Sequence, residues 1–144
     1  MREESGRSLI EILGVLAIGA TMLAAAYSMY KTIDNRQKRL ITFETIADIA
    51  KKTKILYEYS GYTGVTVGKL ITDGAIESAK LPIGTLEIDP KPYTFTIIVS
   101  GLTKDECEYF KIKKADWAAK IKPNNDDNGT CTNSTTNSFA WYVE

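Results

Sequence analysis

The sequence contains no histidine, which removes the commonest general base and the commonest metal ligand. It also has no net charge, because 18 lysines and arginines balance 18 aspartates and glutamates. No overall field attracts a charged polymer, so we expect no specific nucleic-acid partner. These absences argue against an enzyme, and we expect no catalytic residues, no cofactor and no bound metal.

Cysteine is also scarce, and the two that occur, Cys107 and Cys131, lie in the last third of the chain. An isolated pair suits one disulfide, which would close a loop of about 25 residues and contribute roughly 3 to 4 kcal/mol. Such a bond persists only outside the cytoplasm. The alternative is that the two cysteines are unrelated small residues of the core.

A long apolar run is present near the N-terminus, where Ile12 to Tyr30 carries no charge. As a helix rising about 1.5 Å per residue it would extend roughly 28 Å, close to the thickness of the bilayer hydrocarbon. It is therefore a candidate transmembrane segment. Small residues within it would let neighbouring helices approach closely, namely Gly14, Ala17, Gly19, Ala20, Ala24, Ala25 and Ala26.

Glu11 lies at the start of this run, where an unpaired carboxylate is costly, so we expect it to have a partner. The stretch Gly6-Arg7-Ser8-Leu9-Ile10-Glu11 and the apolar residues after it resemble the prepilin signature of type IV pilins and type II secretion pseudopilins. That signature is a polar leader ending in Gly, then an apolar helix with Glu at the fifth mature position. Counted from Arg7, Glu11 takes that position.

The resemblance implies that a prepilin peptidase cuts between Gly6 and Arg7, removing residues 1–6. The family normally methylates the new amino group, which here is that of Arg7, although the family's first residue is most often Phe or Met. In the family's filaments the glutamate neutralises the amine of a neighbouring subunit, so that two costly charges satisfy each other. Glu11 would take this assembly role, and Arg7 could share the pairing.

The partners that this resemblance implies are further copies of the chain in a homopolymeric filament, the peptidase, the membrane and an inner-membrane assembly platform. The expected location is the bacterial inner membrane before assembly and an extracellular pilus, or fimbrium, afterwards. The positive-inside rule favours the opposite orientation, because basic residues such as Lys31 and Arg36 follow the span. The cysteine pair and the cleavage signature both require an exported C-terminal region, so we follow them.

Two other interpretations of the N-terminus remain. An ordinary secretory signal peptide could be cut at Ala24-Ala25-Ala26, before Tyr27, although its leader should be basic and Glu11 is out of place in it. A simple single-pass anchor is the other.

No proline interrupts residues 7–60, and apolar residues recur at three- and four-residue steps after the span. We therefore expect one long helix, with an assembly half over 7–30 and an amphipathic half over 31–60. A globular head should follow over 61–144. This is an α+β, pilin-like fold in which the helix packs on a small antiparallel sheet.

The head should contain strands over Thr85–Ile88, Tyr93–Val99 and Phe139–Val143, and a short helix over Leu70–Ala79. Thr103-Lys104-Asp105-Glu106 is a capping box that should begin a short helix carrying Cys107. Residues 123–138 should form a loop tied down by Cys131, as in type IV pilins, and this arrangement is most similar to the type IVb branch.

The loop contains Asn124, Asp126 and Asp127, which could bind calcium, but their spacing matches no defined calcium loop and a solvated loop is favoured. Two triplets, beginning at Asn128 and Asn133, match the glycosylation pattern. We expect a structural subunit of a type IV pilus. The alternatives are a type II secretion pseudopilin and a membrane-anchored binding module that does not polymerise.

Overall fold

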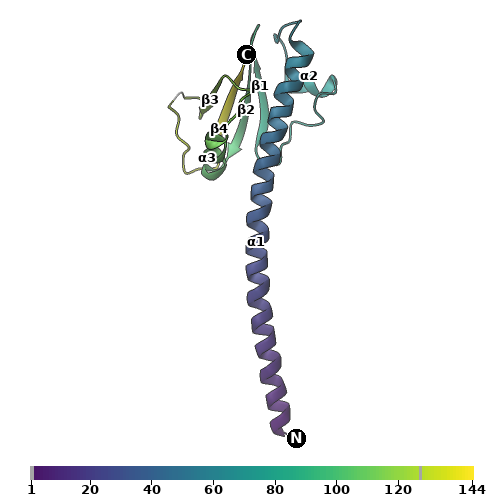
Figure 1. Cartoon of the computed structure of the whole chain (residues 1–144), viewed down its shortest axis with the longest axis vertical. Coiled ribbons are helices and arrows are strands. Elements are labelled where there is room, and N and C mark those ends of the chain that lie inside the picture. Colours follow the sequence, from purple (N-terminus) through teal and green to yellow (C-terminus); the bar gives the residue numbers. More distant parts are fainter. Residues whose placement is uncertain (1, 127) are drawn as a thin grey trace. The chain divides into compact units, whose positions relative to one another are not determined.

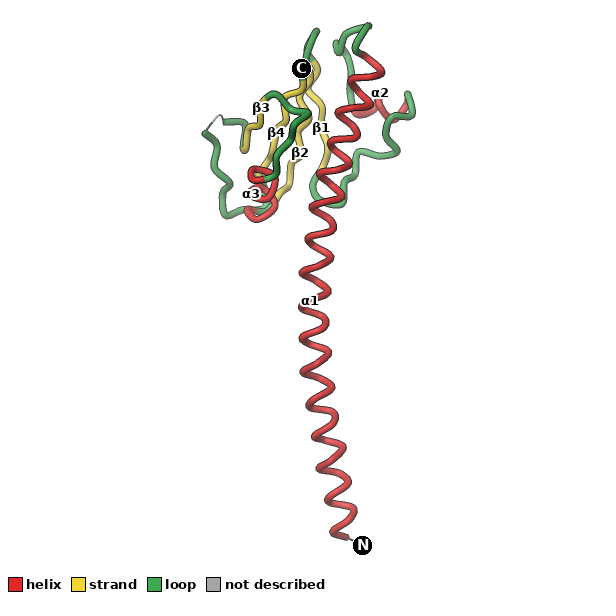
Figure 2. Tube along the Cα trace, in the orientation of Figure 1, coloured by secondary structure: helices red, strands yellow, loops and turns green. Residues whose placement is uncertain are grey.

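The computed structural model describes the backbone of residues 2–126 and 128–144 and the side chains of residues 8–126 and 128–144. Its elements are α1 (Arg2–Tyr57), α2 (Val67–Thr72), β1 (Thr85–Pro90), β2 (Phe95–Leu102), α3 (Lys104–Ile112), β3 (Lys120–Pro123) and β4 (Asn137–Val143). Figures 1 and 2 show these elements along the chain. The expected α+β fold, a long N-terminal helix with a small antiparallel sheet, is confirmed.

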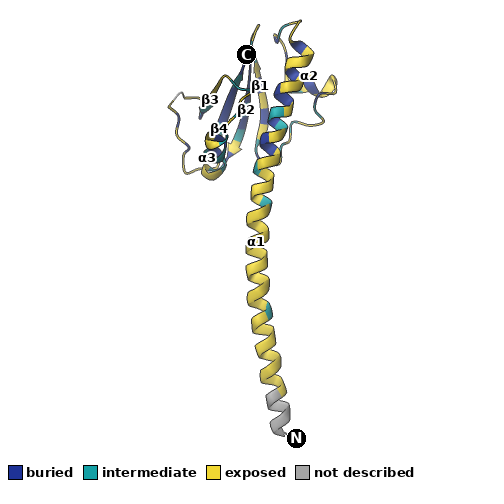
Figure 3. Cartoon of the chain, in the orientation of Figure 1, coloured by how far each residue is buried: buried dark blue, intermediate teal, exposed yellow. Residues whose placement is uncertain are grey.

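The chain divides into two compact units, one ending at Gln37 and one spanning Lys38–Glu144. We call them the N-terminal unit and the C-terminal unit. The described side chains of the N-terminal unit belong to α1 and are almost all exposed, as the yellow ribbon in Figure 3 shows. Within the described part of the chain, α1 is the one helix long and apolar enough to span a membrane.

The sheet of the C-terminal unit is antiparallel throughout and has the strand order β1-β2-β4-β3. Its register aligns apolar residues on one face: Ile88 pairs with Ile97, and Ile97 pairs with Trp141. Ile121 of β3 pairs with Trp141 from the other side. Because side chains alternate along a strand, these residues share one face, and that face forms the core.

The C-terminal part of α1 contributes one side to this core. Its buried residues recur at three- and four-residue steps and belong to the same cluster as the sheet face: Phe43, Ile46, Ile49, Ala50 and Tyr57. Leu40 and Leu56 belong to the apolar pattern that follows the span in the sequence, but both are exposed. Tyr57 takes the last position instead, since it continues the spacing set by Ile46, Ala50 and Thr53.

Aromatic rings connect the layers of the C-terminal unit. The Phe43 ring of α1 lies 6.2 Å from that of Trp117, which lies 6.0 Å from that of Trp141 in β4. Phe110 of α3 meets Trp141 edge-on at 5.3 Å. Helix α3 therefore packs on the same side of the sheet as α1, and the layer order is helices on one face of four strands.

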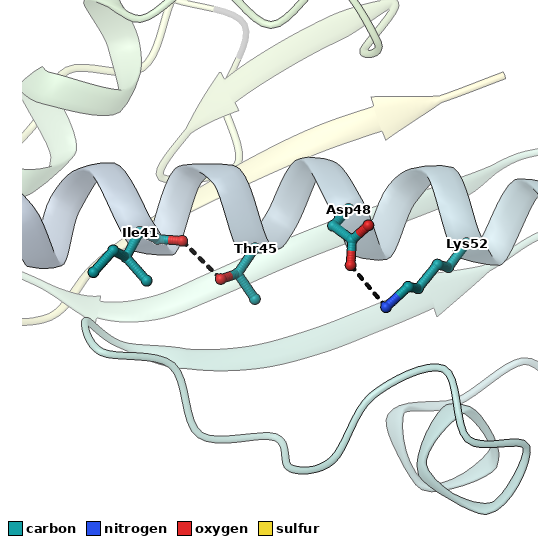
Figure 4. Close-up of polar contacts among 4 residues, drawn as sticks. All are labelled: Ile41, Thr45, Asp48 and Lys52. Carbon is teal, nitrogen blue, oxygen red and sulfur yellow. Dashed lines mark hydrogen bonds and ion pairs between the residues drawn. The ribbon is translucent and has the colours of Figure 1, made fainter.

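The exposed side of α1 in this unit carries local polar contacts beside several apolar side chains. Figure 4 shows the Asp48 carboxylate 2.8 Å from the Lys52 ammonium, one turn apart, and the Thr45 hydroxyl donating to the Ile41 carbonyl. Such an exposed ion pair contributes only about 0.3 to 0.5 kcal/mol. The burial of the opposite side, and not this pair, fixes the helix on the sheet.

The sequence-based boundaries differ from the structure in several places. Strand β1 extends two residues past its expected end, to Pro90, and β4 begins two residues earlier than expected, at Asn137. The helix expected over 70–79 is α2, which begins after the cap Thr66 and ends at Thr72, with Asp73 as its C-terminal cap. The central strand begins at Phe95 and extends past the expected end to Leu102, where Gly101 has a φ of 76°. Strand β3 was not expected, because four residues with two lysines and a proline carry no clear strand pattern.

Candidate functional site

The processing site expected at Gly6 and Arg7 lies where the structure describes no side chains. This covers leader cleavage after Gly6, methylation at Arg7 and the part of Arg7 in assembly. The helix α1 includes the backbone of both residues. The candidate site is therefore built from residue 8 onward.

Glu11 is described, and it is exposed on α1 among large apolar side chains that are also exposed. Ile10 and Ile12 flank it, with 70% and 53% of their surfaces accessible. Within residues 8–126 and 128–144, no hydrogen bond or ion pair is recorded for its carboxylate. Because an isolated charge in an apolar environment is costly, Glu11 needs a partner once the surrounding apolar surface is covered.

Small side chains form a face along the apolar part of α1. At about 100° per residue, Gly14, Ala17, Thr21, Ala24 and Ser28 fall on one side of the helix. A methyl group built on Gly14 or Gly19 would meet no atom of this chain within 4 Å. The chain's own fold therefore does not require these glycines, and what they permit is a close approach by another helix.

The two threonine hydroxyl groups in this part of α1 bond inside the helix. Thr21 Oγ1 donates to the Ile18 carbonyl at 2.8 Å, and Thr32 Oγ1 donates to the Ser28 carbonyl at 3.0 Å. Neither threonine presents an unpaired donor to an apolar environment. Glu11 is the one acidic or basic residue between residues 8 and 30, so its carboxyl group is the costliest one that the segment would bring into lipid or against other helices.

The second expected feature, the disulfide, joins Cys107 and Cys131 with a Cα to Cα distance of 5.8 Å. Cys107 lies in the second turn of α3, whose start is fixed by the expected capping box. The Thr103 hydroxyl accepts from the Glu106 amide, and the Glu106 carboxylate accepts from the Thr103 amide. The bond therefore attaches the loop after β3 to a helix that is itself anchored in the core.

Asn137, at the start of β4, also holds this loop, and sequence analysis did not single it out. Its side chain is fully buried. Its Oδ1 accepts from the Thr132 amide at 2.8 Å, and its Nδ2 donates to the carbonyls of Thr132 and Leu102 at 2.9 and 3.2 Å. One side chain therefore connects the loop to the end of β2. No signal in the sequence separates it from the other asparagines nearby.

The candidate calcium ligand Asn124 is used within the protein. Its Nδ2 donates to the Thr130 carbonyl at 2.8 Å, and its Oδ1 accepts from the Ser138 amide at 3.0 Å. Asp126 Oδ1 accepts from the Asn128 amide, and Asp127 lies outside the described residues. Within the described part of the chain, no group of three or more acidic, cysteine or histidine side chains is placed to hold a metal.

Five aromatic residues of the C-terminal unit differ in their burial. Tyr57, Tyr62 and Trp141 are buried, and Trp117 packs against the core cluster. Tyr59 differs, because its side chain is fully exposed. It therefore takes no part in the core of this chain.

The long helix and the small antiparallel sheet with a disulfide-bonded loop are consistent with a pilin-like fold. No protein-family model matches the sequence, and no curated protein matches it.

Proposed function

We propose that this chain is a structural subunit of a type IV pilin-like filament. The observation that carries the proposal is the N-terminal segment of α1. Its described side chains form an apolar helical surface that is almost entirely exposed. It has a face of small residues, and Glu11 lies just before the apolar run. A helix that only anchors a protein in lipid needs neither the small face nor the carboxylate.

In this function the apolar half of α1 first holds the subunit in the inner membrane and then packs against the same segment of other copies. Association of such helices depends on close packing, because lipid tails already satisfy apolar surface. The small face of Gly14, Ala17 and Thr21 supplies that packing. The Glu11 carboxylate then neutralises the N-terminal amine of a neighbouring subunit after cleavage behind Gly6.

The experiment compares the wild type with Glu11→Ala in the native cells. The ratio of subunit in sheared surface filaments to total cellular subunit is the quantity measured. A buried amine without its partner can cost roughly 3 to 5 kcal/mol, enough to lower subunit addition more than a hundredfold. Glu11→Ala should therefore accumulate as subunit with scarce filaments, while the Cys107–Cys131 disulfide still forms.

Glu44→Ala is the matched control, because Glu44 is an exposed glutamate on the same helix in the C-terminal unit. It should leave the ratio unchanged. Intact mass of the mature wild type should begin at Arg7, whereas a start at Tyr27 would indicate an ordinary secretory signal. An equal filament ratio for Glu11→Ala and the wild type would contradict the assembly role.

The pseudopilin alternative is distinguished by abundance, because a pilus subunit is made in many copies whereas a secretion pseudopilus is short. A membrane-anchored module that does not polymerise would be absent from sheared filaments even in the wild type.

A further inference from the structure

A cavity of about 570 Å³ lies in the C-terminal unit at the end of α1. Its walls are residues 58–63, the turn residues Pro92 and Tyr93, and the side chains of Lys54 and Glu144. The volume falls within the range of about 300 to 1,000 Å³ that is common for small-ligand sites. Neither the apolar half of α1 nor the disulfide-bonded loop contributes to it.

Hydrogen bonds fix the two turns that form the cavity. The Gly61 amide donates to the Tyr57 carbonyl at 2.9 Å, and the Tyr62 amide donates to the Pro92 carbonyl at 3.3 Å. Gly61 has a φ of 80°, and a methyl group there would lie 3.1 Å from the Pro92 oxygen. The glycine therefore lets the two turns meet, and the cavity exists without a ligand to form it.

Two tyrosines at the cavity are unusually exposed. Tyr59 is 100% accessible and Tyr93 is 87% accessible, although tyrosine normally covers part of its ring. Tyr62, on the same wall, is instead buried with its ring 4.8 Å from that of Phe95. The turns that carry Tyr59 and Tyr93 are fixed through their backbone, and the rest of the chain leaves both rings uncovered and available to a ligand.

Several polar side chains at the cavity are available to bond to a ligand. Within the described part of the chain, no hydrogen bond or ion pair is recorded for the side chains of Ser60, Thr63 or Glu58. The two hydroxyls can both donate and accept, and the carboxylate accepts. Two carboxylates and one ammonium line the site, which disfavours a phosphate or another polyanion.

A ligand suited to this lining has flat apolar faces and many hydroxyl groups but no negative charge. Pyranose rings have this chemistry, since the C–H bonds of one face stack on an aromatic ring while the hydroxyls form hydrogen bonds. We propose that the cavity binds an uncharged oligosaccharide. Tyr59 and Tyr93 stack on its rings, and Ser60, Thr63 and Glu58 bond to its hydroxyls.

The test is calorimetric titration of the full chain with uncharged hexasaccharides. The panel holds α- and β-linked glucose, mannose, galactose and N-acetylglucosamine oligomers. The protein is kept in a zwitterionic detergent, because a sugar-headed detergent would compete for the site. Binding is measured on unassembled protein, so its outcome is separate from that of the filament experiment.

At least one hexasaccharide should bind, and Tyr59→Ala and Tyr93→Ala should each weaken it about twofold to tenfold. Tyr59→Phe keeps the ring and should retain the affinity. Ile112→Ala is the matched control, because Ile112 is 82% accessible in the same unit but does not line the cavity. The proposal is overturned if no member of the panel binds, if the double alanine variant binds as the wild type does, or if Ile112→Ala loses as much affinity.

Discussion

Replacing Asn137 with alanine should destabilise the C-terminal unit more than the removal of one polar side chain ordinarily does. Besides the contacts described above, its Oδ1 accepts from Asn124 Nδ2 and from the Thr132 hydroxyl, each at 3.0 Å. Its Nδ2 also donates to the Ser134 carbonyl at 3.1 Å. Asn137→Ala removes all six contacts and leaves the space of the side-chain amide empty.

The magnitude follows from which groups lose their partner. The Leu102 carbonyl bonds to Asn137 in a buried environment, so its loss costs about 1 to 3 kcal/mol. The Thr132 amide and the loop carbonyls are partly open to water, and each bond there contributes about 0.5 to 1 kcal/mol. We expect a total of about 3 to 5 kcal/mol. For a unit of this size, that lowers Tm by about 15 to 25 °C.

The assay is thermal unfolding of the full chain in detergent, followed by near-ultraviolet circular dichroism. Trp117 and Trp141 pack in the core of the C-terminal unit and report on its tertiary structure, whereas helicity would also include the N-terminal unit. Asn133→Ala is the matched control, because Asn133 is exposed in the same loop. It should change Tm by only a few degrees.

The same pair should also be measured with Cys107–Cys131 reduced. Asn137 and the disulfide hold one loop, so their effects should be coupled, and the loss from Asn137→Ala should differ between the oxidised and reduced protein. A Tm for oxidised Asn137→Ala within a few degrees of that for Asn133→Ala would refute the reasoning, because it would mean that the buried network contributes little.

Two further predictions concern single contacts. Gly84 has a φ of 75°, and a methyl group there would lie 2.6 Å from the Ser100 oxygen, so Gly84→Ala should cost about 2 to 4 kcal/mol in chemical unfolding. Gly74→Ala is its control, because Gly74 has a similar φ but open space around it, and an equal loss in both variants would disprove the steric account. Burial, followed by the hydrogen bond to Asp73 and the charge of Asp73, raises the pKa of Tyr57 to about 12 in the C-terminal unit, outside the apolar run of residues 12–30. This stabilisation is present below pH 10 and lost as the pH rises from about 10 to 12, so the stability difference between wild type and Tyr57→Phe should shrink over that interval, and a constant difference would contradict it.

The sequence alone determined the parts that depend on local pattern. The uncharged run from Ile12 to Tyr30 and the absence of proline before residue 60 specify one long helix, whatever it packs against. The capping box at Thr103 specifies the start of α3 in the same way, because its partners lie within one turn. A lone pair of cysteines suggested one disulfide, since each had no other candidate partner.

Only the tertiary structure decided the parts that depend on residues far apart in the chain. In the sequence, nothing separates Asn137 from the other asparagines nearby. Only the fold brings the carbonyl of Leu102, 35 residues away, to its side-chain amide. Strand β3 has weak intrinsic preference and exists because β4 offers a free edge for Ile121 to pair beside Trp141. Tyr59 and Tyr93 become neighbours at one cavity only because the two turns that carry them are bonded through Tyr62 and Pro92. Contacts of this kind have no local signature in the sequence. Each one depends on a core surface, a strand edge or a turn that a distant segment supplies.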